Sequence, residues 1–228
     1  MPEDDTPTIQ PGIQVERNGP YRVSGRVALS RTAQVETEYE EPVDWAPFEP
    51  LEAAAEYALC RCGRSATKPF CDDTCTTLTW DSAEVADPAL RETRVRVFEG
   101  EGVVMTDDHS LCTHAGFCGD RFTSVWQMIR HTDDPAIRER LEAMIDRCPS
   151  GTLAHARDRA SEDDEPEFDK GIGVIKDGPL WIRGGIPVVS ADGDAHEVRN
   201  RMTLCRCGGS GNKPFCDGSH WENGFRDG

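Results

Sequence analysis

Four residues near the C-terminal end have the types and the spacing of metal ligands. Cys205, Cys207, Cys216 and His220 lie in the run CRCGGSGNKPFCDGSH, in which one residue separates the first two thiols. Thiolates and imidazoles are ligands that soft transition metals accept. Cys216 and His220 are four positions apart, so on a helical turn their side chains project from the same face. The run therefore predicts a metal centre with three sulfur ligands and one nitrogen ligand.

An earlier run, CRCGRSATKPFCDDTC, repeats the same pattern. Cys60, Cys62 and Cys71 fall at the same offsets as the three later cysteines, and Cys75 takes the place of His220. A thiolate ligates iron at least as well as an imidazole does. We therefore predict one site with four cysteine ligands and a second site with three cysteines and a histidine.

Both runs resemble the CDGSH (NEET-type) iron–sulfur motif, C-x-C-x2-S/T-x3-P-x-C-D-G-S/A/T-H. The run at 205–220 matches every specified position, whereas the run at 60–75 has Asp73 for the glycine and Cys75 for the histidine. The resemblance implies a 2Fe–2S cluster at each site. It also implies that the C-x-C pair binds one iron and that the two later ligands bind the other.

Structural zinc and disulfide bonds are the alternatives for these cysteines. Zinc sites usually begin with the spacing C-x2–4-C, which neither run has. Disulfide bonds require an oxidising compartment. The first twelve residues, MPEDDTPTIQPG, are acidic and have no apolar core, so we expect no signal peptide and a cytoplasmic protein.

Six polar residues beside the ligands are candidates for contacts with the clusters. The aspartates follow the third cysteine at a helix start, where a carboxylate can accept backbone N–H groups. The serines can donate hydrogen bonds to cluster sulfurs or cap the loop, and the lysines can balance the cluster charge or stay solvated. The set is Ser65, Ser210, Asp72, Asp217, Lys68 and Lys213.

A third group of cysteines lies between the two motifs. Cys112 and Cys118 in LCTHAGFCGDRF, with Cys148 in the later RCPSGTL, resemble the ligands of mono-cluster ferredoxins, C-x2-C-x2-C…C-P, and of the divergent mono-cluster (4Fe–4S) family. Ala115 occupies the middle position and cannot bind metal. The resemblance implies one 3Fe–4S or 4Fe–4S cluster. His114 is a candidate fourth ligand, and its alternatives are a hydrogen-bond donor beside the cluster or an exposed loop histidine.

Local patterns place these cysteines on defined elements. The stretch 133–148 predicts a helix with Asp134 as N-cap, Pro135 at its first position and an apolar stripe that ends at Cys148. The stretch 95–105 predicts a β-hairpin around its two glycines. Assigning four, three and three cysteines to the three sites accounts for all ten in the chain.

The chain also repeats itself outside the motifs. The stretches 18–29 and 177–188 share a Gly-Pro pair and period-two alternation, which predicts half-buried strands before each motif. We expect an α+β fold in which two β-rich CDGSH-type halves form an intramolecular pseudo-two-fold unit around an inserted ferredoxin-like domain. The predicted domains are 1–90, 91–158 and 170–228, with an acidic linker at 159–169.

Composition limits the partners of the protein. A formal net charge of -17 repels phosphate backbones and anionic membrane surfaces, so neither nucleic acid nor a membrane is an expected partner. No apolar run approaches the eighteen residues of a membrane span. We expect a monomer with a protein partner that exchanges electrons or accepts clusters.

The predicted function is iron–sulfur cluster binding for electron transfer or for cluster storage and transfer. The chain has no nucleophile–base pair, Walker loop or dinucleotide motif, which favours a protein without its own substrate site. The alternatives are a structural or binding module with zinc or inert clusters, and an electron-transfer subunit of an oxidoreductase complex. If electrons are relayed, the sequence suggests the middle cluster as intermediary between the two CDGSH-like sites.

Overall fold

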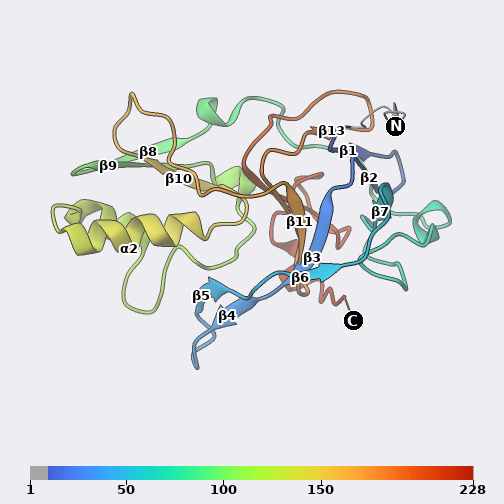
Figure 1. The fold of residues 1–228 in the computed structure, drawn as a ribbon, viewed down its shortest axis with the longest axis horizontal. Helices are drawn as coiled ribbons and strands as arrows, with labels where there is room; N and C mark the ends of the chain where they lie inside the picture. The colour runs from blue at the N-terminus through green and yellow to red at the C-terminus, as the bar shows by residue number, and fades with distance from the viewer. Residues whose placement is uncertain (1–9, 228) are drawn as a thin grey trace, which may run out of the picture.

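The computed structural model describes residues 10–227, so most of the N-terminal segment on which the signal-peptide prediction rests lies outside the described residues. Strands dominate and the helices are few, as expected for the α+β class. Figure 1 shows an elongated arrangement, with the sheet of β8, β9 and β10 at one end and strands of both CDGSH-like halves at the other. In the described part of the chain, no helix is long and apolar enough to cross a membrane.

Two sheets form the larger part of the molecule. The first has the order β13–β1–β2–β7 and the second the order β14–β12–β11–β3–β6. Their bounds are Gly12–Val15 (β1), Tyr21–Ser24 (β2), Ala28–Thr32 (β3), Glu49–Leu51 (β6), Tyr57–Leu59 (β7), Gly171–Ile175 (β11), Leu180–Arg183 (β12), Val188–Val189 (β13) and Arg201–Leu204 (β14). Strands are thus confirmed within 18–29 and 177–188, but the expected half-buried antiparallel pattern holds only in part, because β12 is almost fully buried and β3 and β13 each have a parallel neighbour.

The two halves exchange one strand each. β13 of the C-terminal half lies parallel to β1, with Ile13 opposite Val188, and β3 of the N-terminal half lies parallel to β11, with Leu29 opposite Ile172. The order β1–β2–β7 in one sheet matches β11–β12–β14 in the other. The halves are therefore joined through their sheets, while a two-fold relation between them stays a prediction.

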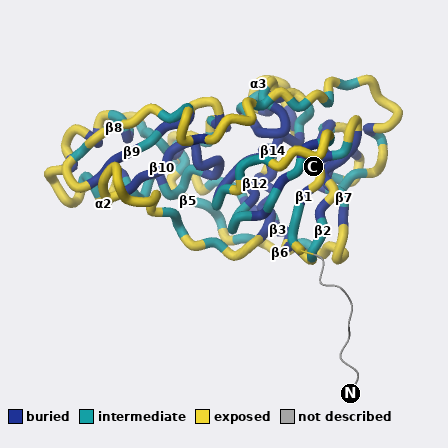
Figure 2. The backbone as a smooth tube through the Cα atoms, turned by 90° about the horizontal axis from the view of Figure 1, so that it is seen from above, coloured by how far each residue is buried: buried dark blue, intermediate teal, exposed yellow. Residues whose placement is uncertain are grey.

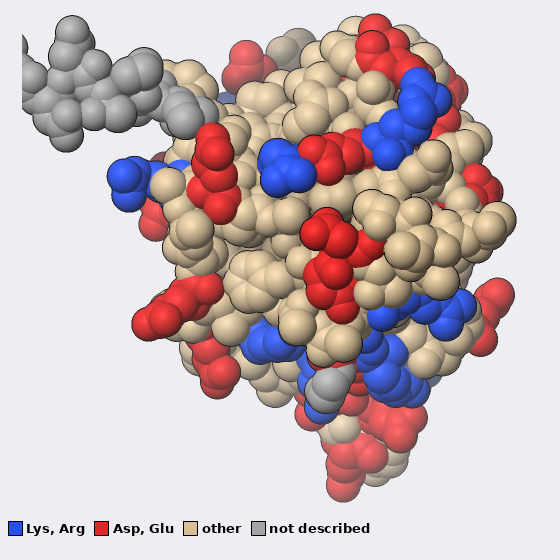
Figure 3. All heavy atoms as spheres, turned by 90° about the vertical axis from the view of Figure 1, so that its right-hand side faces the viewer, with Lys and Arg blue, Asp and Glu red and all other residues tan. Residues whose placement is uncertain are grey.

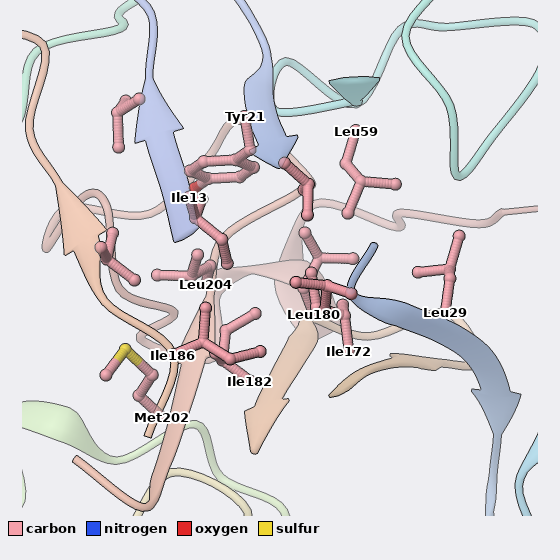
Figure 4. Close-up of a cluster of buried hydrophobic side chains, with 14 of the residues drawn as sticks. Ile13, Tyr21, Leu29, Leu59, Ile172, Leu180, Ile182, Ile186, Met202 and Leu204 are labelled. Atoms are coloured by element: carbon pink, nitrogen blue, oxygen red, sulfur yellow. The ribbon is translucent and has the colours of Figure 1, made fainter. Parts of the chain in front are cut away.

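A single apolar core fills the space between these sheets. Figure 4 shows side chains of both halves meeting there, among them Ile13 and Tyr21 from the first half and Ile172 and Leu204 from the second. Strand β1 alternates buried and exposed residues, whereas β11, which lies between β12 and β3, is buried along its whole length. The two halves therefore share one core.

The middle module folds around its own smaller core. Strands β8 (Arg96–Gly100), β9 (Val103–Asp107) and β10 (Leu153–Ala156) form an antiparallel sheet on which helix α2 (Pro135–Asp146) packs. The predicted hairpin and helix are both confirmed, and the Asp134 side chain accepts a hydrogen bond from the N–H of Ala136 at 2.9 Å. The helix ends shortly before Cys148, which fixes that cysteine at the rim of the module.

The remaining elements are short and connect the larger ones. Strands β4 and β5 form a separate hairpin, and four single 3-10 turns and two one-turn helices lie in the connections. Their bounds are Gln34–Glu36 (β4), Pro42–Trp45 (β5), Thr74–Thr76 (η1), Arg91–Thr93 (η2), His109–Leu111 (η3), Val125–Met128 (α1), Ile129–His131 (η4) and Ser219–Glu222 (α3).

A buried arginine ties the middle module to the C-terminal half. The Arg201 guanidinium donates to the carbonyls of Ile145, Asp146 and Cys148 at 2.9 to 3.0 Å and pairs with Glu165 at 2.7 Å. Its side chain is fully buried. Figure 2 shows buried backbone in β10 of the middle module and in β14 of the C-terminal half. Because Glu165 belongs to the segment predicted as a linker, that segment is anchored here as well as connecting two domains.

The surface carries charges of both signs. On the face seen from the end opposite the middle module, Asp and Glu side chains are interspersed with Lys and Arg (Figure 3). This distribution is typical of a solvated protein surface.

Candidate metal centres

The ligands of the second motif lie in two close pairs. The sulfurs of Cys205 and Cys207 are 3.7 Å apart, and Cys216 Sγ lies 3.4 Å from Nδ1 of His220. Helix α3 begins at Ser219 and positions His220 one turn after Cys216. The charge of Cys207 raises the pKa of Cys216, and the charge of Cys216 raises the pKa of Cys205, so the two pairs lie near each other.

The first motif has the same arrangement with four sulfurs. Cys60 Sγ lies 3.9 Å from Cys62 Sγ, and Cys71 Sγ lies 3.7 Å from Cys75 Sγ. The four residues form one small cluster, on which Trp80 packs. The structure thus brings together every ligand that the sequence predicted at these two sites.

The spacing within each pair fits two ligands of one tetrahedral metal. A tetrahedral metal held at about 2.3 Å from each thiolate places the two sulfurs about 3.8 Å apart, and one thiolate with one imidazole about 3.5 Å apart. The observed distances of 3.7 to 3.9 Å and of 3.4 Å agree with these values. Among residues 10–227, no three His, Cys, Asp or Glu side chains converge to hold a single ion. All ten cysteines, which the structure describes, are free.

Backbone bridges create this geometry in both motifs. Leu59 lies opposite Phe70, and Leu204 lies opposite Phe215, so each C-x-C pair is brought beside the third cysteine of its motif. The N–H groups of Cys71 and Cys216 complete the turn by donating to strands β7 and β14 at 2.9 Å.

The six polar residues flanking the ligands brace these loops. Ser65 and Ser210 each donate to a carbonyl five residues later at 2.7 Å, and Asp72 and Asp217 each accept two backbone N–H groups. The amines of Lys68 and Lys213 donate to the carbonyls of the same serines. Backbone hydrogen bonds, first of all from Ala66, hold the pKa of Asp72 at about 2. Of the two roles that the sequence left open for the serines, these contacts favour loop capping.

One thiol of each C-x-C pair is favoured as a thiolate, whereas burial raises the pKa of Cys71 and Cys216 to about 12. The hydrogen bond from Cys62, opposed by burial, lowers the pKa of Cys60 to about 6, and the hydrogen bond with Cys205 does the same for Cys207. Burial and the charge of Arg206 lower the pKa of His220 to about 4. One thiolate in each C-x-C pair and a neutral imidazole are the forms that bind iron.

The three middle cysteines also lie near one another. Burial first, and then the charges of Cys148 and Cys112, raise the pKa of Cys118 to about 11. Burial and the charge of Cys148 likewise raise the pKa of Cys112. A cluster at this position would therefore be held by these three thiolates, with Ala115 on the same loop contributing no ligand.

The ring of His114 lies against the second motif. A Cβ added to Gly218 would meet Cδ2 of His114 at 2.5 Å, and the positive charge of His114 lowers the pKa of His220. His114 is exposed, and its ring packs edge-on against His109 at 6.3 Å. Among its three proposed roles, this placement favours the exposed loop histidine.

The sequence analysis missed three residues that lie at the sites. The Thr113 hydroxyl donates to Cys216 Sγ at 3.0 Å, although 103 positions separate the two residues. Arg61 and Arg206, the central residues of the two C-R-C runs, are buried behind the ligands. The arginines could have been suspected from their repetition, whereas the threonine could not.

The two CDGSH-like loops touch each other. Cys62 and Cys207 form an isolated antiparallel bridge, and a Cβ on Gly63 would meet the Cys207 carbonyl oxygen at 2.5 Å. The reciprocal contact, from Gly208 to the Cys62 oxygen, is 2.6 Å. Only glycine fits such an approach at a positive φ, which is 75° at Gly63 and 78° at Gly208.

Comparison with known families finds two kinds of domain in the chain. The model of the iron-binding zinc finger CDGSH type matches residues 18–74 and 177–221, and the model of the divergent 4Fe-4S mono-cluster domain matches residues 98–158. The first match ends one residue before Cys75, the position that differs from the motif. No curated protein and no solved structure matches the chain.

The chain therefore carries two CDGSH-type regions with a divergent 4Fe-4S mono-cluster region between them, and it is an iron–sulfur cluster-binding protein.

Proposed function

We propose that this protein relays electrons between three iron–sulfur centres within one chain. The observation that carries the proposal is the contact of Cys62 with Cys207, which makes the two CDGSH-like sites immediate neighbours. A bound iron–sulfur cluster supplies reversible one-electron redox chemistry. The role of the protein is then to hold the centres close together and to set their potentials.

The proposed ligand sets follow from the pairs described above. Two 2Fe–2S clusters are held by Cys60, Cys62, Cys71 and Cys75 and by Cys205, Cys207, Cys216 and His220. A 3Fe–4S or 4Fe–4S cluster is held by Cys112, Cys118 and Cys148. Backbone N–H groups point at the sulfurs of Cys71, Cys207 and Cys216 at 3.4 to 3.5 Å and stabilise their negative charge.

Cluster transfer is the second candidate function, and one observation favours it. His220 and Trp221 line a cavity of about 230 Å³ beside the second site. An imidazole ligand leaves iron when it is protonated, and a thiolate does so less readily. A recipient protein with free thiols could therefore take a cluster from this side.

The partner in either case is expected to be another protein. An electron donor or acceptor would serve the relay, including the catalytic chain of an oxidoreductase complex, and a cluster acceptor would serve transfer. A module with zinc or inert clusters would need neither.

Metal and sulfide analysis of protein prepared without air tests the proposal. We expect about six to eight irons per chain, with acid-labile sulfide and an EPR signal that appears or disappears on reduction. Stoichiometric zinc with little iron would refute it. Clusters that are reduced and reoxidised repeatedly without loss support the relay, whereas their passage to a thiol-containing acceptor supports transfer.

A further inference from the structure

The middle module touches the second CDGSH-like site through one short segment. The hydroxyl of Thr113 donates to Cys216 Sγ at 3.0 Å, and the Asn212 amide donates to the Ser110 carbonyl at 2.8 Å. The ring of His114 covers Gly218, next to the Thr113–Cys216 contact. Three adjoining contacts therefore seat the segment 110–114 on the ligand loop of the second site.

The hydrogen bond of Thr113 is buried. Thr113 is 3% exposed and Cys216 is 2% exposed, so water does not compete for this interaction. Hydrogen bonds to charged acceptors are stronger than neutral ones, and a low local dielectric strengthens them further. The donor also comes from a different module than the sulfur that accepts it.

The first site presents a different surface to such a segment. At the position of Gly218 it has Asp73, an exposed residue whose side chain would occupy the space that the His114 ring takes at the second site. In Figure 1 the η1 region of the first site lies at the end of the molecule opposite β8 and β9. The docking of the middle module is therefore specific to the histidine-containing site.

We propose that Thr113 sets the reduction potential of the His220-containing site and connects that site to the middle centre. Resting on the proposed cluster assignments, this role has two parts. The hydroxyl stabilises negative charge on Cys216 and so raises the reduction potential of that site. The peptide from Cys112 to Thr113 and one hydrogen bond also join a ligand of one centre to a ligand of the other.

The proposed electron step is balanced within the chain. One electron leaves the reduced centre, which is oxidised by one unit, and enters the oxidised centre, which is reduced by one unit. No bond to a substrate forms or breaks, and the Thr113 proton stays on its oxygen. Dithionite or a photoreductant supplies the first electron in the experiment.

Thr113→Val keeps the shape of the side chain and removes the hydroxyl, so it is the decisive variant. We expect a roughly tenfold fall in the reduced-to-oxidised ratio of the His220-containing site at a fixed ambient potential, or ~59 mV for one electron. Thr113→Ser keeps the hydroxyl and should stay close to the wild-type value. The potential of the Cys60–Cys75 site, measured in the same sample, serves as the internal control.

Two further measurements separate tuning from a merely structural role. In the wild type, transfer into D2O should shift the Raman-active iron–thiolate stretching bands of the second site, and Thr113→Val should lose that shift. Electron equilibration between the middle centre and the second site after a reducing flash should be at least several-fold slower in Thr113→Val. If Thr113→Val does not fold, Thr113→Ala provides the same comparison.

The result that overturns the proposal is an unchanged potential together with unchanged equilibration in the variant without the hydroxyl. A shift of equal size at the Cys60–Cys75 site would also overturn it, because the effect would then be global. Failure of the proposed function is distinguishable, since it appears as missing iron in the wild type before any variant is compared.

Discussion

Cys62 lies directly opposite Cys207 in an antiparallel bridge that joins the two CDGSH-like loops. Residues paired in this way have Cα atoms about 4.5 to 5.5 Å apart. The glycine after each cysteine touches the carbonyl oxygen of the other. The two ligand loops are therefore in direct backbone contact.

This contact predicts the effect of one added methyl group. Gly208→Ala should lower the free energy of unfolding by about 1–3 kcal/mol, because its Cβ would collide with a backbone oxygen. Gly193→Ala is the matched control, since Gly193 also has a positive φ but has nothing within 4 Å. Urea unfolding followed by tryptophan fluorescence measures both, and equal losses would show that the contact contributes nothing.

The two CDGSH-like clusters should differ in reduction potential. A fourth thiolate adds negative charge at Cys75 where the second site has neutral His220, so the first site should have the lower potential. Two histidines raise Rieske centres by several hundred millivolts, and a single one should give a shift on the order of 100 mV. Spectroelectrochemical titration of single-site variants measures the difference. A higher potential at the all-cysteine site would contradict the charge argument.

The second site should be the one that acid destroys. Burial lowers the pKa of His220 to about 4, below its ordinary value near 6.5, so the folded site resists protonation that the unfolded chain accepts. Between these two values, stability should therefore fall as the pH falls. His220→Cys should remove the acid-sensitive phase of visible bleaching. Bleaching that is unchanged in this variant would exclude His220 as a ligand.

His155 should make the middle module less stable at alkaline pH. Burial, the largest single influence, would lower the pKa of His155, but the hydrogen bond to Asp146 at 3.1 Å and the negative charges of Asp146, Glu142 and Asp164 together raise it. A pKa raised by folding gives stability that is complete below the unfolded value of about 6.5 and is lost as pH rises through the folded value.

Unfolding midpoints at pH 6 and pH 8 test this dependence. His155→Gln should reduce the difference between the unfolding midpoints at pH 6 and pH 8. Substitution of the exposed His131 by Gln is the control. An undiminished difference in His155→Gln would assign the pH dependence to another group.

Sequence and structure agree best where the signal is local. The helix begins after Asp134 because an N-cap, a proline and an apolar stripe coincide within a few residues. The ligand pairs of both motifs are also local, since two or four positions separate their members. His114 shows the limit of prediction from the sequence. Its position in the loop was compatible with a role as a metal ligand, and only the tertiary packing shows that its ring lies against Gly218.

The sequence by itself determined the three motif regions and most of the elements that hold them, and it predicted their ligands, because short-range spacing controls which side chains share a turn. Tertiary structure alone decided which sites are neighbours. The sequence suggested the middle cluster as intermediary, whereas the contacts of Cys207 with Cys62 and of Cys216 with Thr113 place the second site between the other two. Those contacts join residues more than 100 positions apart, where only the exchange of strands and the packing of modules can set the distance.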